Sequence, residues 1–245
     1  DPSQKYPMLV YFYEKRSDNL NRYNIPSPIA TVINWSYCVS NGYLVFIPDV
    51  VFRKGEPGAS SYDAVVSGVK SLIDRYDFID KDRIALNGHS WGGYQIAFLV
   101  TRTNMFKAAV SGAPVVNMTS AYGGIRWESG KSRMFQYEQT QSRIGGTLWD
   151  KPAEFIRNSP LFFLPQVQTP VLIMHNDKDG SVMWEQGIEF FMALRRLDKP
   201  VWLFNYKGEG HHLKKWENRL DYSRRVMEFY DYYLKDGKKP EWMKS

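Results

Sequence analysis

Short apolar runs alternate along the chain with longer segments in which apolar residues recur every three or four positions. Runs rich in Val, Ile, Leu or aromatic residues that end at Gly, Pro, Asn or Asp are typical of strands buried on both faces of a sheet. They predict strands over residues 8–13, 43–47, 84–86, 108–111, 171–175 and 201–206. Helical spacing predicts helices over residues 62–75, 93–103, 184–197 and about 221–234. The alternation predicts an α/β fold with a mostly parallel central sheet flanked by helices.

The segment from residue 117 to 160 follows neither period well and contains two glycine pairs and several aromatic residues. We predict that it forms an excursion over the sheet rather than a separate domain, because long connections of this kind often form the walls of a site. Its aromatic residues either pack in the core or line a pocket for the acyl side of a substrate: Tyr122, Trp127, Phe135, Tyr137 and Trp149. A chain of 245 residues then forms one domain over residues 1–245.

Composition and charge narrow the classes of function. Hydrophobic residues make up 43% and charged residues 24%, as in an ordinary globular protein. The net charge is +6, but Lys and Arg are interspersed with Asp and Glu, so we expect no nucleic-acid partner. No apolar run approaches the roughly 18 residues that a membrane span needs. Cys38 is the only cysteine, which excludes an internal disulfide and a cysteine cluster for zinc.

Gly88-His89-Ser90-Trp91-Gly92 has the form Gly-x-Ser-x-Gly. The pattern alone is weak, but here it follows a predicted strand directly and precedes a predicted helix. This is the context of a nucleophile elbow, in which a sharp turn requires small residues beside the serine. We therefore predict that Ser90 is a nucleophile held in a strained backbone conformation above the sheet edge. The alternative, a serine that caps an ordinary helix, leaves the flanking glycines unexplained.

A serine hydroxyl needs a base, which is usually a histidine oriented by a carboxylate. The chain has four histidines. His89 adjoins the serine and should point away from its hydroxyl, and His175 ends a strand, where we expect it to shape a turn. His211 and His212 lie in a glycine-rich loop after the last predicted strand. The base is therefore one of these two.

The carboxylate is expected in the loop Asn176-Asp177-Lys178-Asp179-Gly180, which follows the preceding strand. Asp177 and Asp179 both lie at the carboxyl end of a strand, where catalytic groups gather in open α/β sheets. The order Ser, Asp, His is that of the α/β hydrolases. Their position does not decide which of the two aspartates is the triad carboxylate. The one outside the triad then caps the next turn or helix.

Three blocks of the sequence resemble the active-site blocks of the prolyl oligopeptidase family, which includes dipeptidyl peptidases and acylaminoacyl peptidases. They are Gly88-His89-Ser90-Trp91-Gly92-Gly93-Tyr94, His175-Asn176-Asp177-Lys178-Asp179 with Val182, and Glu209-Gly210-His211. The similarity extends over nearly the whole chain. It implies an α/β-hydrolase fold, with Asp179 as the acid and His211 as the base. Asn176 stands where that family more often has Gly, and we interpret it as a tolerated turn residue.

The opening Lys5-Tyr6-Pro7-Met8-Leu9-Val10-Tyr11-Phe12-Tyr13 is similar to the first strand of that family's catalytic domain. The resemblance implies that Tyr13 donates its hydroxyl to the oxyanion, although Glu14-Lys15-Arg16 replaces the Gly-Pro-containing turn of dipeptidyl peptidases. The second donor is expected to be the backbone N–H of Trp91, the residue after the nucleophile. The resemblance also implies an upstream β-propeller, so we expect the chain to be part of a longer protein.

These inferences predict a serine peptidase that hydrolyses short peptides through an acyl-enzyme, without a metal or organic cofactor. The resemblance leans toward Pro or Ala before the scissile bond. An esterase acting on small acyl esters is the alternative among enzymes, since the same groups cleave both bonds. A non-catalytic binding module of the same fold is the alternative outside enzymes. We expect no membrane partner, and a periplasmic or secreted location for the whole protein, whose targeting segment is not found in this chain.

Overall fold

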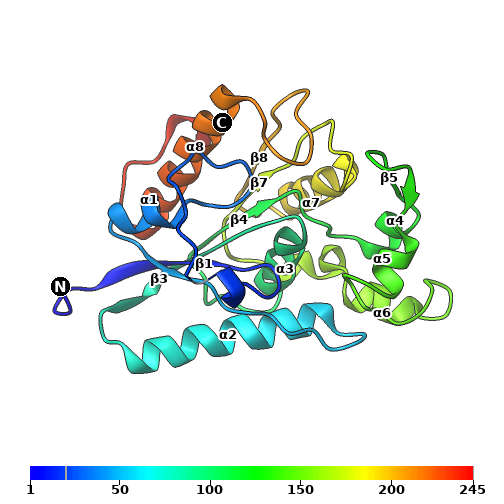
Figure 1. The fold of residues 1–245 in the computed structure, drawn as a ribbon, viewed down its shortest axis with the longest axis horizontal. Helices are drawn as coiled ribbons and strands as arrows, with labels where there is room; N and C mark the ends of the chain where they lie inside the picture. Colours follow the sequence, from blue (N-terminus) through cyan, green and yellow to red (C-terminus); the bar gives the residue numbers. More distant parts are fainter. Residues whose placement is uncertain (20, 245) are drawn as a thin grey trace.

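The computed structural model describes residues 1–19 and 21–244. In this part of the chain six parallel strands form the central sheet, in the order β2-β1-β3-β4-β7-β8 (Figure 1). The strands are β1 (Tyr6–Tyr11), β2 (Leu44–Phe46), β3 (Ile79–His89), β4 (Ala108–Gly112), β7 (Val171–Met174) and β8 (Val201–Phe204). Each overlaps a strand predicted from the sequence. The α/β fold with a parallel central sheet is confirmed.

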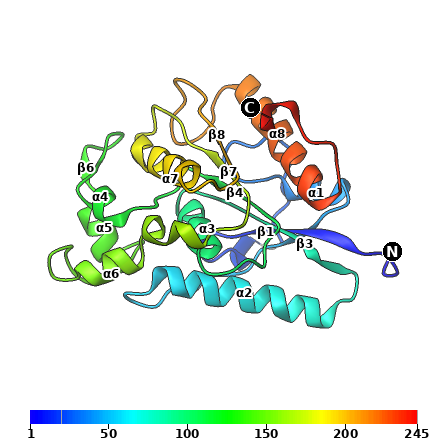
Figure 2. The ribbon, with the colours of Figure 1, turned by 180° about the vertical axis from the view of Figure 1, so that it is seen from behind.

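Helices cover both faces of the sheet (Figures 1 and 2). Because successive side chains of a strand point to opposite faces, Met8 and Val10 of β1 join one apolar cluster and Leu9 and Tyr11 join another. The first cluster lies under α2 (Pro57–Arg75), α3 (Trp91–Val100) and α7 (Trp184–Arg196), and the second under α1 (Trp35–Ser40) and α8 (Trp216–Leu234). None of the helices within the described ranges is both long and apolar enough to cross a membrane.

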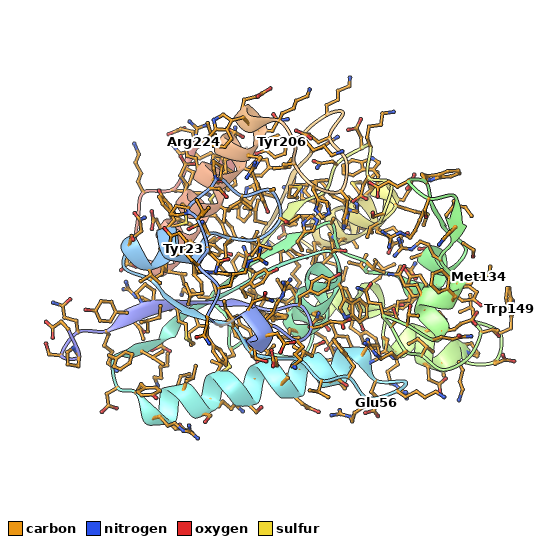
Figure 3. All side chains as sticks on the ribbon, in the orientation of Figure 1. Tyr23, Glu56, Met134, Trp149, Tyr206 and Arg224 are labelled. Carbon is orange, nitrogen blue, oxygen red and sulfur yellow. The ribbon has the colours of Figure 1, made fainter. Side chains whose placement is uncertain are left out.

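The excursion predicted after residue 117 packs on the core through a third apolar cluster, which joins Tyr122 and Tyr137 to Trp91. Trp127 and Trp149 are instead 72% and 74% exposed, and Trp149 lies at the outer edge of the molecule (Figure 3). Of the two interpretations, packing therefore holds for Tyr122 and Tyr137. The excursion consists of α4 (Met118–Tyr122), β5 (Ile125–Arg126), β6 (Lys131–Ser132), α5 (Met134–Glu138) and α6 (Pro152–Arg157).

Several elements begin earlier than their apolar pattern predicts. β3 starts at Ile79, five residues before the apolar run, because the buried Ile79 pairs with Tyr6 of β1 across an intervening polar stretch. α2 starts at Pro57, which fits the first turn of a helix, and its first turns pack through small residues such as Gly58. α1 and the helices of the excursion had no predicted counterpart.

Short 3₁₀ turns complete the fold: η1 (Ser17–Asn19), η2 (Pro160–Gln166) and η3 (Glu241–Met243).

The carboxyl ends of parallel strands meet at one edge of the sheet, and this edge collects the residues singled out by the sequence. Tyr13 follows β1, Ser90 follows β3, Asp179 follows β7 and His211 follows β8. The strand order β3-β4-β7-β8 brings Ser90 and His211, which are more than 100 residues apart, to the same cavity.

Candidate active site

Ser90 lies at the turn between β3 and α3. Its backbone has φ 58° and ψ −116°, a conformation that is strained for a residue with a side chain. A Cβ on Gly88 would come within 2.8 Å of the Gly92 backbone, and one on Gly92 would lie 2.7 Å from the Phe12 carbonyl oxygen. The Ser90 N–H donates to the Gly112 carbonyl at 2.8 Å, which ties the turn to β4. The chain thus has the strand, sharp turn and helix that a nucleophile elbow requires.

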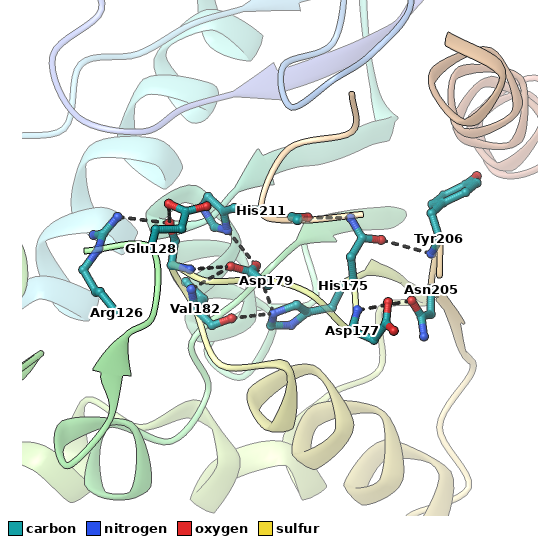
Figure 4. A network of polar contacts seen from close by, with 12 residues as sticks. Arg126, Glu128, His175, Asp177, Asp179, Val182, Asn205, Tyr206 and His211 are labelled. Atoms are coloured by element: carbon teal, nitrogen blue, oxygen red, sulfur yellow. Dashed lines mark hydrogen bonds and ion pairs between the residues drawn. The ribbon is translucent and has the colours of Figure 1, made fainter. Parts of the chain in front are cut away.

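Asp179 lies in the loop after β7, and both oxygens of its buried carboxylate are hydrogen bonded (Figure 4). Oδ1 accepts the backbone N–H groups of Ser181 and Val182, each at 2.8 Å. Oδ2 lies 2.7 Å from Nδ1 of His211 and 3.3 Å from Nε2 of His175. Burial alone would raise the pKa of this carboxyl, but hydrogen bonds from His175 and His211 and their coulombic attraction hold the pKa well below its usual range. Asp179 is therefore ionised.

His211 follows β8, is 7% exposed, and lines the same cavity as Ser90. Because an ionised carboxylate can only accept hydrogen bonds, the contact with Asp179 assigns the ring hydrogen to Nδ1 and leaves a lone pair on Nε2. An imidazole in this tautomer, which lines one cavity with a serine, has the free lone pair that a general base needs.

The loop that carries His211 is fixed by the buried carboxylate of Glu209. Its two oxygens accept the backbone N–H groups of Lys214 and Lys215 and the side-chain amide of Asn218, at 2.7–2.9 Å. Burial would raise the pKa of Glu209, but these hydrogen bonds outweigh it and lower the pKa. Glu209 therefore acts as an anionic cap that folds the loop back on the start of α8.

Asn176 joins the loop of the acid to the loop of the base. Its Nδ2 donates to the Gly210 carbonyl at 2.8 Å, and its Oδ1 accepts the Tyr206 N–H at 3.0 Å. Asn176 thus bridges two loops, which the interpretation as a tolerated turn residue missed. Asp177, the other candidate acid, points away from His211 and accepts the Gly208 N–H at 2.7 Å (Figure 4).

Two further histidines stand beside His211. The ring centroids of His89 and His212 lie 4.7 Å and 4.8 Å from that of His211, and both residues line the cavity. Burial, together with the neighbouring histidines, lowers the pKa of His89 well below its usual value. Burial and then His211 lower the pKa of His212 as well. Both rings are therefore neutral near pH 7, and neither contacts Asp179 within hydrogen-bond distance.

Of the two expected oxyanion donors, Tyr13 lines the cavity, and Trp91 directly follows the cavity residue Ser90. Tyr13 lies two residues beyond β1 and lines the cavity, and its hydroxyl oxygen accepts Nε2–H of Gln141 at 3.0 Å, so that its own hydrogen stays free to donate. The Trp91 N–H is the first of α3 and donates to no other described residue. The cavity has a volume of about 370 Å³. In the described ranges no three His, Cys, Asp or Glu side chains are grouped to hold a metal ion.

Comparison with known proteins places this arrangement in a family. Residues 33–237 match the profile of the Prolyl oligopeptidase family. The chain belongs to the prolyl oligopeptidase family. The resemblance found in the three sequence blocks is thereby confirmed.

Relatives in the prolyl oligopeptidase family are much longer than this chain. It is 31% identical over 166 residues to the uncharacterized peptidase YuxL of Bacillus subtilis. The aligned stretch covers 66% of this chain and 23% of that protein. It is 23% identical over 265 residues to dipeptidyl-peptidase 5 of Porphyromonas endodontalis, covering 96% of this chain and 34% of that protein. The chain therefore spans about a quarter to a third of these curated relatives.

The fold is shared with solved peptidases. The acylaminoacyl peptidase of Pyrococcus horikoshii superposes with a TM-score of 0.78 at 17% identity, over 100% of this chain and 40% of that one. At this level of identity the likeness shows the fold alone.

His175 is the main feature of the site that the sequence did not predict. Its fully buried Nε2 lies 3.1 Å from the Val182 carbonyl oxygen and 3.3 Å from Asp179 Oδ2. Both neighbours are acceptors, so Nε2 carries the hydrogen and donates to them. The only signal in the sequence is the spacing of four residues between His175 and Asp179, which is equally compatible with the turn that we expected.

Proposed function

We propose that this chain is the catalytic domain of a serine peptidase that hydrolyses peptide bonds of short peptides through an acyl-enzyme. The observation that carries the proposal is the 2.7 Å contact between His211 Nδ1 and Asp179 Oδ2, in a cavity shared with the strained Ser90. Membership of the prolyl oligopeptidase family supports peptides as substrates.

In the proposed reaction Ser90 Oγ attacks the carbonyl carbon while its proton passes to Nε2 of His211. The ionised Asp179 stabilises the imidazolium that forms and keeps the ring in place. The Trp91 N–H and the Tyr13 hydroxyl donate to the oxyanion of the tetrahedral intermediate. His211 then returns the proton to the leaving amine as the C–N bond breaks. A water molecule releases the acyl group by the same steps in the second half.

The remainder of the protein is proposed to include a β-propeller upstream of this domain. The greater length of the relatives supports an additional domain. The resemblance of this chain to the prolyl oligopeptidase family, which implies a propeller before the catalytic domain, supports the choice of a propeller. Its presence would restrict access to the carboxyl edge of the sheet and would select short peptides over folded proteins.

Labelling with a fluorophosphonate probe tests the proposal. The adduct should map by mass spectrometry to the peptide that contains Ser90, and Ser90→Ala should abolish it. Ser129→Ala, on the exposed tip of the β5–β6 hairpin, is the matched control and should label like the wild type. A folded protein that is not labelled, or an adduct on another serine, would exclude this mechanism. Higher turnover of small esters with no turnover of matched peptide amides would favour an esterase.

A further inference from the structure

An arginine is buried in the wall of the cavity that holds Ser90. Arg133 is only 2% exposed, and its Nε and Nη1 atoms are buried without a hydrogen-bond partner among the described residues. Its guanidinium carbon lies 5.6 Å from the centre of the Tyr137 ring. A contact of this kind offsets only part of the cost of removing a cation from water. The proposed reaction gives this side chain no role.

The backbone places Arg133 firmly at this position. It lies between β6 and α5, and its N–H donates to the Gly124 carbonyl at 3.0 Å. Tyr137, one turn further along α5, belongs to the apolar cluster that also contains Trp91 and Val182. The guanidinium is therefore held by the same packing that supports the residues next to Ser90 and Asp179.

The charges around the cavity are unbalanced. Three arginines line it, Arg16, Arg126 and Arg133, and none of them has a carboxylate within ion-pair distance in the described ranges. Glu128 is the only carboxylate among the lining residues, and it accepts the hydroxyl of Ser181, which in turn accepts Nη2–H of Arg126 (Figure 4). The cavity therefore attracts a negatively charged group.

A guanidinium is a planar fork of donors that matches a carboxylate in two parallel hydrogen bonds. An incoming carboxylate would supply the anionic partner that the Arg133 guanidinium lacks among the described residues. A neutral side chain such as that of Gln would leave the guanidinium charge uncompensated.

We propose that this cavity binds a carboxylate of the peptide substrate and that Arg133 pairs with it. The inference rests on the proposed peptidase function and adds its substrate class: peptides with Asp or Glu beside the scissile bond, or short peptides whose terminal carboxylate reaches the cavity. It differs from the expectation of Pro or Ala before the bond, which came from the family resemblance alone.

Two pairs of substrates separate the two sources of the carboxylate in the full-length protein. The first pair consists of N-acetylated peptide coumarylamides that end in Glu or in Gln. The second consists of one neutral tripeptide with a free or an amidated C-terminus. We expect kcat/KM to favour the carboxylate by about tenfold or more in one of the pairs, as a charge-assisted pair should. A ratio near one in both pairs would overturn the inference.

Variants then connect the preference to Arg133. Arg133→Met should bring the ratio close to one, and Arg133→Lys, which keeps the charge, should restore part of it. Arg157→Met is the matched control, because Arg157 is exposed and lies outside this cavity, and it should keep the wild-type ratio. A folded Arg133→Met protein that keeps the preference would contradict the assignment. If this variant does not fold, the wild-type ratios and Arg133→Lys decide.

Failure of the inference is distinguishable from failure of the proposed function. Labelling of Ser90 and hydrolysis of the neutral ester p-nitrophenyl acetate report on the serine machinery and do not require a carboxylate. A protein that passes both assays but shows no carboxylate preference refutes only the role of Arg133. A protein that fails both refutes the peptidase function itself.

Discussion

Replacement of Asp179 by Asn changes one atom at the centre of the site. The asparagine Oδ1 can still accept the N–H groups of Ser181 and Val182, so the loop should keep its conformation. At the other position an NH₂ group replaces the oxygen that faces His211 Nδ1 at 2.7 Å. Since an amide nitrogen can only donate, His211 must present a lone pair at Nδ1 and carry its hydrogen on Nε2. In this tautomer it cannot remove the proton of Ser90.

The expected loss follows from this tautomer change. In a serine triad the same exchange of carboxylate for amide lowers kcat by about 10⁴. At about 1.36 kcal/mol per factor of ten, the barrier rises by about 5.4 kcal/mol. Because the substrate does not contact Asp179, kcat and kcat/KM should fall together while KM changes little.

Asp177→Asn is the matched control. Asp177 is two residues away and accepts the Gly208 N–H, which an asparagine oxygen can also accept. We expect a loss of about threefold or less, as for an ordinary surface substitution. Steady-state kinetics on a peptide coumarylamide, with unfolding temperatures to check the fold of each variant, measure both. The reasoning is refuted if Asp177→Asn is the more damaging change, or if Asp179→Asn retains more than about a tenth of wild-type kcat.

Two further predictions concern Tyr13 and His89. Tyr13→Phe should lower kcat by about 10²–10³ through loss of an oxyanion donor, whereas Tyr6→Phe at the other end of β1 should not; an increase in KM alone would contradict this role. Because burial lowers the pKa of His89, the unfolded chain takes up a proton that the folded state resists, and stability should fall below about pH 6.5, by up to about 1.4 kcal/mol per pH unit. Urea unfolding at about pH 7.5 and about pH 5 should therefore show a smaller difference for His89→Phe than for wild type, and equal differences would contradict the assignment.

The apolar pattern predicted the fold well because the sheet is buried on both faces. Each strand is then a compact apolar run, and even the alternation of Met8 and Leu9 between two clusters follows from strand geometry. The pattern failed where an element extends beyond the core. The first half of β3 contains Asp80, Lys81 and Asp82, which are polar because they face solvent, so their strand conformation leaves no apolar signal.

The site was predicted at the level of loops more reliably than at the level of side chains. Spacing and strand order brought Ser90, one of two aspartates and one of two histidines to the same edge. Position could not choose within each pair, since a loop residue's direction depends on which backbone groups receive its side chain. In the structure Asp179 turns inward to the N–H groups of Ser181 and Val182. The family resemblance supplied this choice, and the catalytic roles themselves stay predictions.

His175 and Arg133 show what local sequence cannot reveal. Both side chains are buried, and their roles depend on contacts made in the folded chain. His175 shares the Asp179 carboxylate with His211. Arg133 reaches the cavity of Ser90 from the excursion. A buried histidine and a buried arginine look in a sequence like any turn or surface residue. Their environments differ in one respect that bears on function. His175 has its acceptors within the protein and so serves to hold Asp179, whereas the Nε and Nη1 atoms of Arg133 have none, which is why we assign its partner to the substrate.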